Sequence, residues 1–308
     1  MTIDRPDAPA IRAFHLTKVY GNEVIAVNDL TFEVPAGVIF GFLGPNGAGK
    51  TTTLRLLLGL QRPTAGQAQV FGYDCGPDAT RVRRLIGYLP TNPKLPGHLK
   101  PFEYLDLVGQ LYRIPADVRR PRIAAILCAV GLLTVADQRI GTLSTGETTR
   151  LGIAASLVGD PPLLLWDEPT AGLDPAARRF ALDLIRELGQ ERTIVVATHI
   201  LADIDQVCTH VGVMHEGRMI FCGSMSEMKR RLRGDSFFLE LGVSEEVRQR
   251  LETSLQELND IAVQWLDGHR LRVTIAEEAS RAAGLAEVLR RVDQAGAVLH
   301  SIQSGLGA

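Results

Sequence analysis

The stretch Gly44-Pro45-Asn46-Gly47-Ala48-Gly49-Lys50-Thr51 fits the pattern GxxxxGK(S/T) at every fixed position. A continuous apolar run at residues 38–43 comes before it, and an apolar-periodic stretch at residues 51–60 comes after it. The run predicts a buried parallel strand, and the stretch predicts a helix. Glycines let consecutive backbone N–H groups curve around a phosphate, and a helix N-terminus adds partial positive charge. The sequence therefore predicts a phosphate-binding loop.

Two carboxylates, Asp167 and Glu168, directly follow a second apolar run at residues 163–166. If that strand lies beside the loop, Asp167 and Thr51 can hold Mg²⁺ while Lys50 reaches the β- and γ-phosphates of a nucleotide. Glu168 is then placed to polarise an attacking water. The same pair is also common at solvated strand ends, so it indicates a magnesium and water site only together with the phosphate loop. Together the two elements are typical of nucleoside triphosphatases.

The strand pattern extends beyond these two elements. A third apolar run lies at residues 193–197, and helical segments separate the three runs. Buried strands that alternate with helices indicate a parallel α/β core. Two alternating runs, residues 11–16 and 30–34, predict further β segments before the loop.

The pattern changes near residues 232–235. Beyond this point the sequence predicts, in order, a strand at 237–241, a helix after the N-cap Ser244, a hairpin around Asp267-Gly268, a helix that stops at Gly296, and a strand at 298–302. The order βαββαβ is typical of a small ferredoxin-like α+β domain. We therefore expect two domains, residues 1–233 and residues 234–308.

Composition limits the function classes. The 308 residues are 45% hydrophobic and 22% charged, which is ordinary for a packed globular protein. The formal net charge of -2 gives no basic surplus, so we expect no nucleic-acid partner. There is no run of about 20 apolar residues, the length that a membrane-spanning helix needs. The first six residues also lack the apolar core of a signal peptide, so we expect a cytoplasmic protein.

A third motif narrows the class. Leu143-Ser144-Thr145-Gly146-Glu147 resembles the LSGGQ signature of ATP-binding cassette (ABC) proteins. Other landmarks of that family follow in order: Tyr20 matches the aromatic residue that stacks on adenine, residues 171–174 match the loop that couples two ATP sites, and His199 matches the switch histidine at the γ-phosphate. The resemblance covers residues 11 to about 230.

The resemblance implies an α/β P-loop ATPase cassette with a mixed sheet core, an antiparallel β subdomain and a helical signature subdomain. It implies that ATP and Mg²⁺ bind and that ATP is sandwiched between two head-to-tail copies of the chain. The implied catalytic residues are Lys50, Glu168 and His199, and the metal ligands are Thr51 and Asp167. The implied ATP-binding residues are Tyr20, Gly44, Pro45, Asn46, Gly47, Ala48, Gly49, Lys50, Thr51 and Thr52, with Ser144, Thr145, Gly146 and Glu147 acting in trans.

Some positions depart from the family pattern. Thr91 stands where the family has a glutamine, and Thr is too short to reach the metal in the same way. Its coupling role then passes to a water or to Asn92, whereas Asp174 keeps the usual coupling position. Thr145 replaces the first signature glycine, and Glu147 replaces the final glutamine. We still expect a competent site because Ser144 and Gly146 remain.

The resemblance also implies a separate membrane permease, which would hold the chain at the inner face of the membrane. Just beyond Thr91, apolar contacts to the permease and packing in the core explain four side chains about equally well: Leu95, Leu99, Phe102 and Leu105. The C-terminal domain resembles the appendage of cassettes in bacterial drug, antibiotic and polysaccharide exporters, which favours export. Its own role is left open between dimerisation and regulation. The alternatives are a soluble ABC protein of translation or DNA repair and a P-loop kinase.

Overall fold

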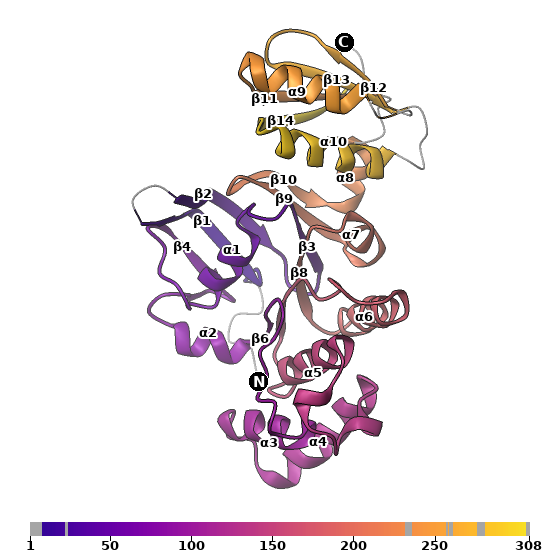
Figure 1. Cartoon of the computed structure of the whole chain (residues 1–308). Coiled ribbons are helices and arrows are strands. Elements are labelled where there is room, and N and C mark those ends of the chain that lie inside the picture. The colour runs from indigo at the N-terminus through magenta and orange to yellow at the C-terminus, as the bar shows by residue number, and fades with distance from the viewer. Residues whose placement is uncertain are drawn as a thin grey trace.

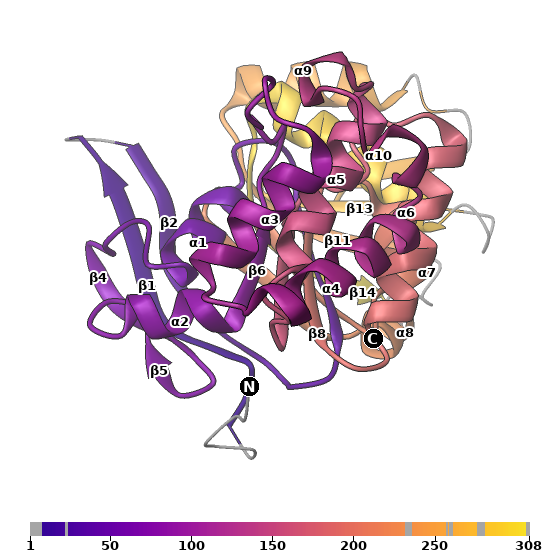
Figure 2. The same ribbon diagram turned by 90° about the horizontal axis from the view of Figure 1, so that it is seen from below.

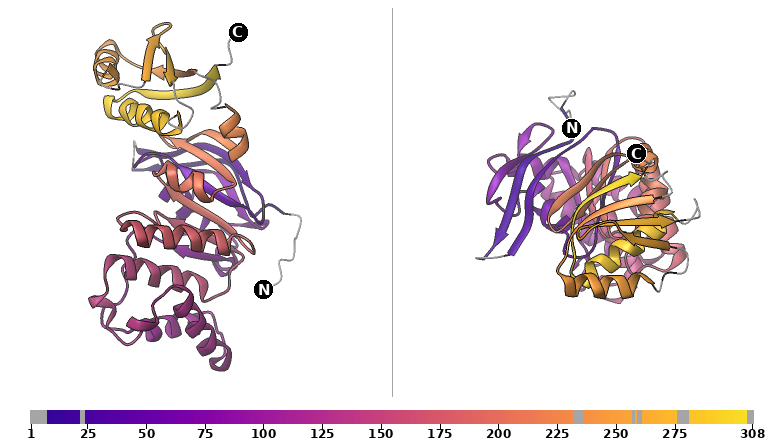
Figure 3. Two further views of the ribbon diagram at one scale, coloured as in Figure 1. Left: turned by 90° about the vertical axis from the view of Figure 1, so that its right-hand side faces the viewer. Right: turned by 90° about the horizontal axis from the view of Figure 1, so that it is seen from above.

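The computed structural model describes residues 8–21, 24–231, 236–256, 258, 261–275 and 281–305. Its strands form three separate sheets (Figure 1). A bundle of helices and the C-terminal domain lie at opposite ends of the molecule, with two of the sheets between them (Figures 1 and 3). The expected domain boundary between residues 233 and 234 lies outside the described residues, so this division of the chain stays a prediction.

The central sheet has six strands, and it carries the candidate site at one edge. Their order across the sheet is β10 (Arg218–Ser224), β9 (His210–His215), β3 (Ile39–Leu43), β8 (Thr193–Thr198), β7 (Leu163–Asp167) and β6 (Ile86–Leu89). All neighbours are parallel except β10, which pairs antiparallel with β9. Helices cover both faces of the parallel strands, so β7 and β8 are buried at every residue, as their continuous apolar runs predict.

A second, antiparallel sheet stands to one side of the helices (Figure 2). Its strands run in the order β2 (Val24–Val34), β1 (Ile11–Tyr20), β4 (Ala65–Val70) and β5 (Tyr73–Asp74). Helix α1 (Lys50–Leu57) follows β3, and α2 (Ala79–Leu85) precedes β6. The rings of Phe32 and Phe42 meet edge to face, with centroids 5.2 Å apart. This contact joins the antiparallel sheet to the strand that leads into the phosphate loop.

The helical part consists of α3 (Pro101–Leu111), α4 (Ala116–Ala129), α5 (Thr145–Leu157) and the short turns η1 (Leu133–Val135) and η2 (Ile140–Thr142). It is fastened to the central sheet through Trp166, which is fully buried and donates from its ring N–H to Ser156 Oγ at 3.1 Å. Helices α6 (Pro175–Leu188) and α7 (Leu201–Val207) connect the later strands of the sheet. The expected cassette fold is confirmed: parallel core, antiparallel sheet and helical part are all present.

The C-terminal domain follows α8 (Met225–Arg231). It consists of β11 (Ser236–Gly242), α9 (Glu245–Gln256), β12 (Ile261–Trp265), β13 (Arg270–Ile275), α10 (Arg281–Ala295) and β14 (Val298–Gly305). The strand order β12-β13-β11-β14, antiparallel throughout, is that of the predicted ferredoxin-like fold. Asp267 Oδ1 accepts hydrogen bonds from the amides of His269 and Arg270 and so closes the predicted hairpin. Helix α10 packs against α7 of the cassette.

Candidate active site

The phosphate loop lies between β3 and α1, and its glycines are required by the backbone. Gly47 and Gly49 have φ of 86° and 96°, which only glycine adopts without strain. A Cβ on Gly49 would lie 2.4 Å from the carbonyl oxygen of Ala26, and one on Gly44 would lie 2.3 Å from that of Met214. The amide of Ala48 donates to Pro45 O at 3.2 Å and tightens the curve. The loop is therefore compact, and its backbone is left-handed at Gly47 and Gly49.

Lys50 begins α1 and is almost wholly buried. Its ammonium group donates to the carbonyl oxygens of Gly44 at 2.6 Å and Pro45 at 3.0 Å, and it lies 3.8 Å from Glu168 Oε1. Burial lowers the pKa of Lys50, while the charges of Glu168 and Asp167 act in the opposite direction. The site thus holds a cation inside the loop, where the phosphates of a nucleotide would need it.

Thr51 and Asp167 meet beside this cation. The Thr51 hydroxyl donates to Asp167 Oδ2 at 2.7 Å, while Asp167 Oδ1 is buried with no hydrogen-bond partner among the described residues. Burial raises the pKa of Asp167, against hydrogen bonds from Thr51 and Thr91 that lower it. A hydroxyl and an under-coordinated carboxylate are oxygen ligands of the kind that Mg²⁺ prefers. The residues present therefore fit a magnesium ion.

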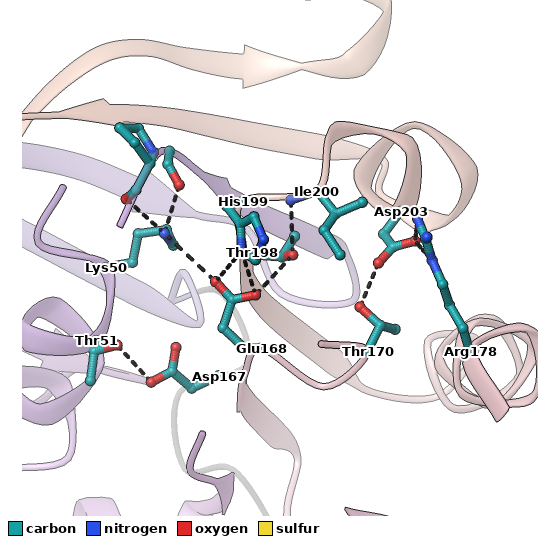
Figure 4. Close-up of polar contacts among 12 residues, drawn as sticks. Lys50, Thr51, Asp167, Glu168, Thr170, Arg178, Thr198, His199, Ile200 and Asp203 are labelled. Atoms are coloured by element: carbon teal, nitrogen blue, oxygen red, sulfur yellow. Dashed lines mark hydrogen bonds and ion pairs between the residues drawn. The ribbon is translucent and has the colours of Figure 1, made fainter. Parts of the chain in front are cut away.

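Glu168 comes directly after β7 and has a left-handed backbone, with φ of 54°. Its amide donates to Ala197 O at 2.8 Å, which ties the turn to β8. His199 Nδ1 lies 3.0 Å from each carboxylate oxygen, and the Thr198 hydroxyl donates to Oε2 at 3.3 Å (Figure 4). These contacts hold the carboxylate in place, and 11% of the Glu168 side chain is exposed.

A second polar cluster lies next to this site. Asp203, on α7, is 1% exposed, and it accepts hydrogen bonds from Thr170 at 2.5 Å and from Arg178 Nε at 2.7 Å (Figure 4). None of these three residues was predicted from the sequence. The available signal was a carboxylate on the same helix as two buried apolar residues, Ile204 and Val207.

The structure brings five predicted side chains together beside the phosphate loop. Lys50, Thr51, Asp167, Glu168 and His199 converge at the carboxyl ends of β3, β7 and β8, and Thr91 reaches Asp167 from the end of β6. These strands are neighbours in one parallel sheet, so their carboxyl ends meet at one edge.

The signature segment caps its own helix. Ser144 is the N-cap of α5, and its side chain accepts from the amide of Glu147 at 3.3 Å. In return the Glu147 carboxylate accepts from Ser144 N at 2.9 Å and Ser144 Oγ at 2.8 Å, which holds the pKa of Glu147 below its usual value. Each of these hydrogen bonds joins Ser144 and Glu147 to each other, so the predicted contact with a partner's ATP stays a prediction.

Tyr20 and Asp174 make local contacts in the described structure. The Tyr20 hydroxyl donates to Gln61 Oε1, and the Lys18 ammonium lies 5.2 Å from the ring centroid. Asp174 is the N-cap of α6, where Oδ1 accepts from the amides of Ala176 and Ala177, each at 2.9 Å. Adenine stacking by Tyr20 and coupling by Asp174 stay predictions.

The four apolar residues beyond Thr91 belong to the core. Leu105 is fully buried, and the three others are partly buried and pack against the core beneath the helices: Leu95, Leu99 and Phe102. Two exposed apolar side chains lie further along α3, where Leu107 is 46% and Leu111 is 77% exposed.

A phosphate loop on a parallel sheet, with a carboxylate for magnesium and another for water at the same edge, defines a P-loop ATPase. The ABC transporter family matches this chain over residues 27–171. The bacitracin transport ATP-binding protein BcrA of Bacillus licheniformis is 38% identical over 77% of this chain and 76% of its own length. The daunorubicin/doxorubicin resistance ATP-binding protein DrrA of Streptomyces peucetius is 39% identical over 75% of this chain and 70% of its own length.

A solved dimeric ATP-binding cassette, in a post-hydrolysis state with ADP and phosphate bound, superposes with a TM-score of 0.65 at 25% identity, over 70% of this chain and 98% of that one. The chain spans 66%, 73% and 75% of the lengths of three further relatives, all ABC transporter ATP-binding proteins. This chain belongs to the family of ABC transporter ATP-binding proteins. It is an ATP-binding and ATP-hydrolysing cassette. Within the described residues, no helix has both the length and the apolar character needed to cross a membrane.

Proposed function

We propose that this chain is the ATPase subunit of an export system, working as a homodimer on a permease that is a separate chain. The observation that carries the proposal is the convergence on one sheet edge of a buried lysine, a hydroxyl, two carboxylates and a histidine: Lys50, Thr51, Asp167, Glu168 and His199. A kinase would not need the histidine beside Glu168 or the signature segment at the start of α5.

In the proposed reaction, Lys50 exchanges the carbonyl oxygens of Gly44 and Pro45 for the β- and γ-phosphates of ATP. Thr51 and Asp167 hold Mg²⁺, which when bound neutralises charge on the same phosphates. Glu168 accepts a proton from the attacking water. His199 orients that carboxylate from one side and reaches toward the γ-phosphate.

The proposed dimer explains the position of the signature segment. Its residues lie at the start of α5, where the helix dipole favours an anion. Because they lie apart from Lys50 in the same chain, a second copy placed head to tail would bring them to the open side of the γ-phosphate. ATP would then join the two copies, and its hydrolysis would release them. A closed C2 dimer of this kind satisfies both sites at once.

The permease and the direction of transport are supported by the relatives. BcrA is described as a bacitracin transport protein and DrrA as a daunorubicin/doxorubicin resistance protein, and both descriptions favour export. The permease would hold the chain at the inner face of the membrane. The exposed Leu107 and Leu111 of α3 offer an apolar surface for that contact.

The first test measures phosphate release from ATP by the purified full-length chain, with Mg²⁺ and with EDTA in its place. We expect release with Mg²⁺ only. The Glu168→Gln variant should form a dimer on size exclusion when ATP is added. Absence of both release and dimer would refute the proposal.

The permease is tested by isolating the tagged chain from detergent-solubilised membranes of its own cells. We expect a polytopic membrane protein in constant ratio to the chain. Recovery of ribosomes or DNA with no membrane protein would instead support a soluble ABC protein.

A further inference from the structure

The Asp203 carboxylate is buried and joins three separate segments. Oδ2 accepts from the Thr170 hydroxyl at 2.5 Å, and Oδ1 accepts from Arg178, whose Nε lies at 2.7 Å and whose terminal nitrogen lies at 2.6 Å (Figure 4). Thr170 belongs to the turn after β7, Arg178 to the first turns of α6, and Asp203 to α7. Both oxygens are therefore satisfied by groups from two other elements, which a buried carboxylate requires.

The two partners of Asp203 flank one loop. Residues 171–174 lie between Thr170 and Arg178, and Glu168 lies two residues before Thr170. The loop's own backbone bonds are long, since Ala171 N donates to Glu168 O at 3.3 Å and Leu173 N donates to Thr170 O at 3.4 Å. The side-chain bonds to Asp203 are shorter and involve an ionised group, which makes them the stronger restraint.

The opposite end of the cluster leads to His199. Helix α7, which carries Asp203, begins at Leu201, so only Ile200 separates it from His199. The amide of Ile200 donates to Thr198 Oγ1 at 3.1 Å. The same Thr198 hydroxyl donates to Glu168 Oε2. Asp203 therefore joins the segment that follows Glu168, through Thr170, to the helix that follows His199.

We propose that Asp203 is a positioning residue for ATP hydrolysis, which clamps the loop at residues 171–174 to α7 and so fixes Glu168 against His199. The inference rests on the proposed role of Glu168, which accepts a proton from the attacking water. A displacement of about 1 Å at a reacting group can lower a rate about 100-fold, so a clamp of this kind affects turnover without touching ATP. Binding of ATP through the phosphate loop does not depend on it.

The test compares Asp203→Asn and Thr170→Val with Asp106→Asn, in the full-length chain. Asp106 is a matched control because its carboxylate pairs with Arg119 Nε at 2.7 Å, with side chains 20% and 11% exposed, between α3 and α4. The measurements are kcat, ATP affinity by titration with a fluorescent ATP analogue, melting temperature, and hydrogen exchange of residues 170–174 by mass spectrometry.

We expect Asp203→Asn to lower kcat by about tenfold or more while ATP affinity stays within about twofold. Exchange at residues 170–174 should become faster in Asp203→Asn and Thr170→Val, and should be unchanged in Asp106→Asn. The inference is overturned if Asp203→Asn keeps its kcat and its exchange, or if kcat falls in all variants only in proportion to melting temperature. Because exchange needs no turnover, loss of kcat in Asp203→Asn with unchanged kcat in Glu168→Gln would refute the proposed role of Glu168, and the exchange rates would still test the clamp.

Discussion

His199 Nδ1 lies 3.0 Å from both carboxylate oxygens of Glu168, although the two residues are 31 positions apart in the chain. The contact is set by the register of the central sheet. β7 and β8 are adjacent parallel strands in which Asp167 lies opposite Ala197, so the residues that follow each strand emerge side by side. The pairing of the two strands therefore orients the carboxylate.

Substitution of Lys50 and of Glu168 should separate binding from chemistry. Lys50→Ala removes the buried cation of the loop, so we expect ATP binding to weaken by about 2–5 kcal/mol and hydrolysis to be nearly lost. Glu168→Gln keeps the shape of the side chain and should preserve ATP affinity while slowing turnover at least about 100-fold. Calorimetric titration with ATP and phosphate release measure the two effects. An equal loss of ATP affinity in both variants would contradict the assignment.

The left-handed backbone of Glu168 should cost stability. A non-glycine residue at φ of 54° is disfavoured by about 1–2 kcal/mol relative to glycine. Glu168→Gly and Glu168→Ala both remove the carboxylate, but only glycine accepts this conformation. We expect Glu168→Gly to be more stable than Glu168→Ala by about 1 kcal/mol in urea denaturation. Equal stability of the two variants would show that the turn relaxes.

Asp167 predicts a pH dependence of stability in the absence of nucleotide and metal. Burial raises its pKa in the folded protein, so folding favours the protonated form. The stability that the protonated Asp167 carboxyl contributes is present at low pH and is lost as pH rises through the raised pKa. We expect Asp167→Asn, which never ionises, to melt higher than wild type at pH 8, with a smaller difference at pH 5. The surface variant Asp183→Asn is the control. A difference that grows toward low pH would have the wrong sign.

Glu147 should tune the ATP-dependent dimer. Its carboxylate accepts two hydrogen bonds from Ser144, at the helix start where we propose that a partner's γ-phosphate binds. Glu147→Gln removes the negative charge, so in the Glu168→Gln background we expect the dimer to form at several-fold lower ATP concentration, with less difference at high salt.

The control for this prediction is Glu227→Gln. Glu227 and Ser224 form a second capping box, with the Ser224 amide 3.0 Å from Glu227 Oε2, at the start of α8. Both substitutions lose one capping charge, and only Glu147→Gln should shift the dimer on size exclusion. A weaker dimer in Glu147→Gln would mean that the carboxylate supports the interface.

The residues that end buried strands could be predicted from the sequence, because the strand pattern fixes which edge they share. Asp167 directly follows an apolar run, Lys50 belongs to the GxxxxGK(S/T) loop that follows another run, and carboxyl ends of parallel strands meet. His199, in contrast, is predicted from its resemblance to the switch histidine of ABC proteins. Asp203 could not be found this way. It lies on a seven-residue helix where a carboxylate is indistinguishable from a solvent-facing one, and its partners are 33 and 25 residues away. Periodicity also could not decide between core and surface for Leu105, which the packing of α3 buries completely.

Helix α10 of the C-terminal domain rests on α7, the helix that carries Asp203. The C-terminal domain is therefore in contact with the cassette, and it cannot be exchanged without changing that contact. A chimaera that joins this cassette to the C-terminal domain of a relative must rebuild the face between α7 and α10 along with the linker. Recombination that transfers the cassette and the C-terminal domain together leaves that face intact. A crossover between the cassette and the C-terminal domain does not.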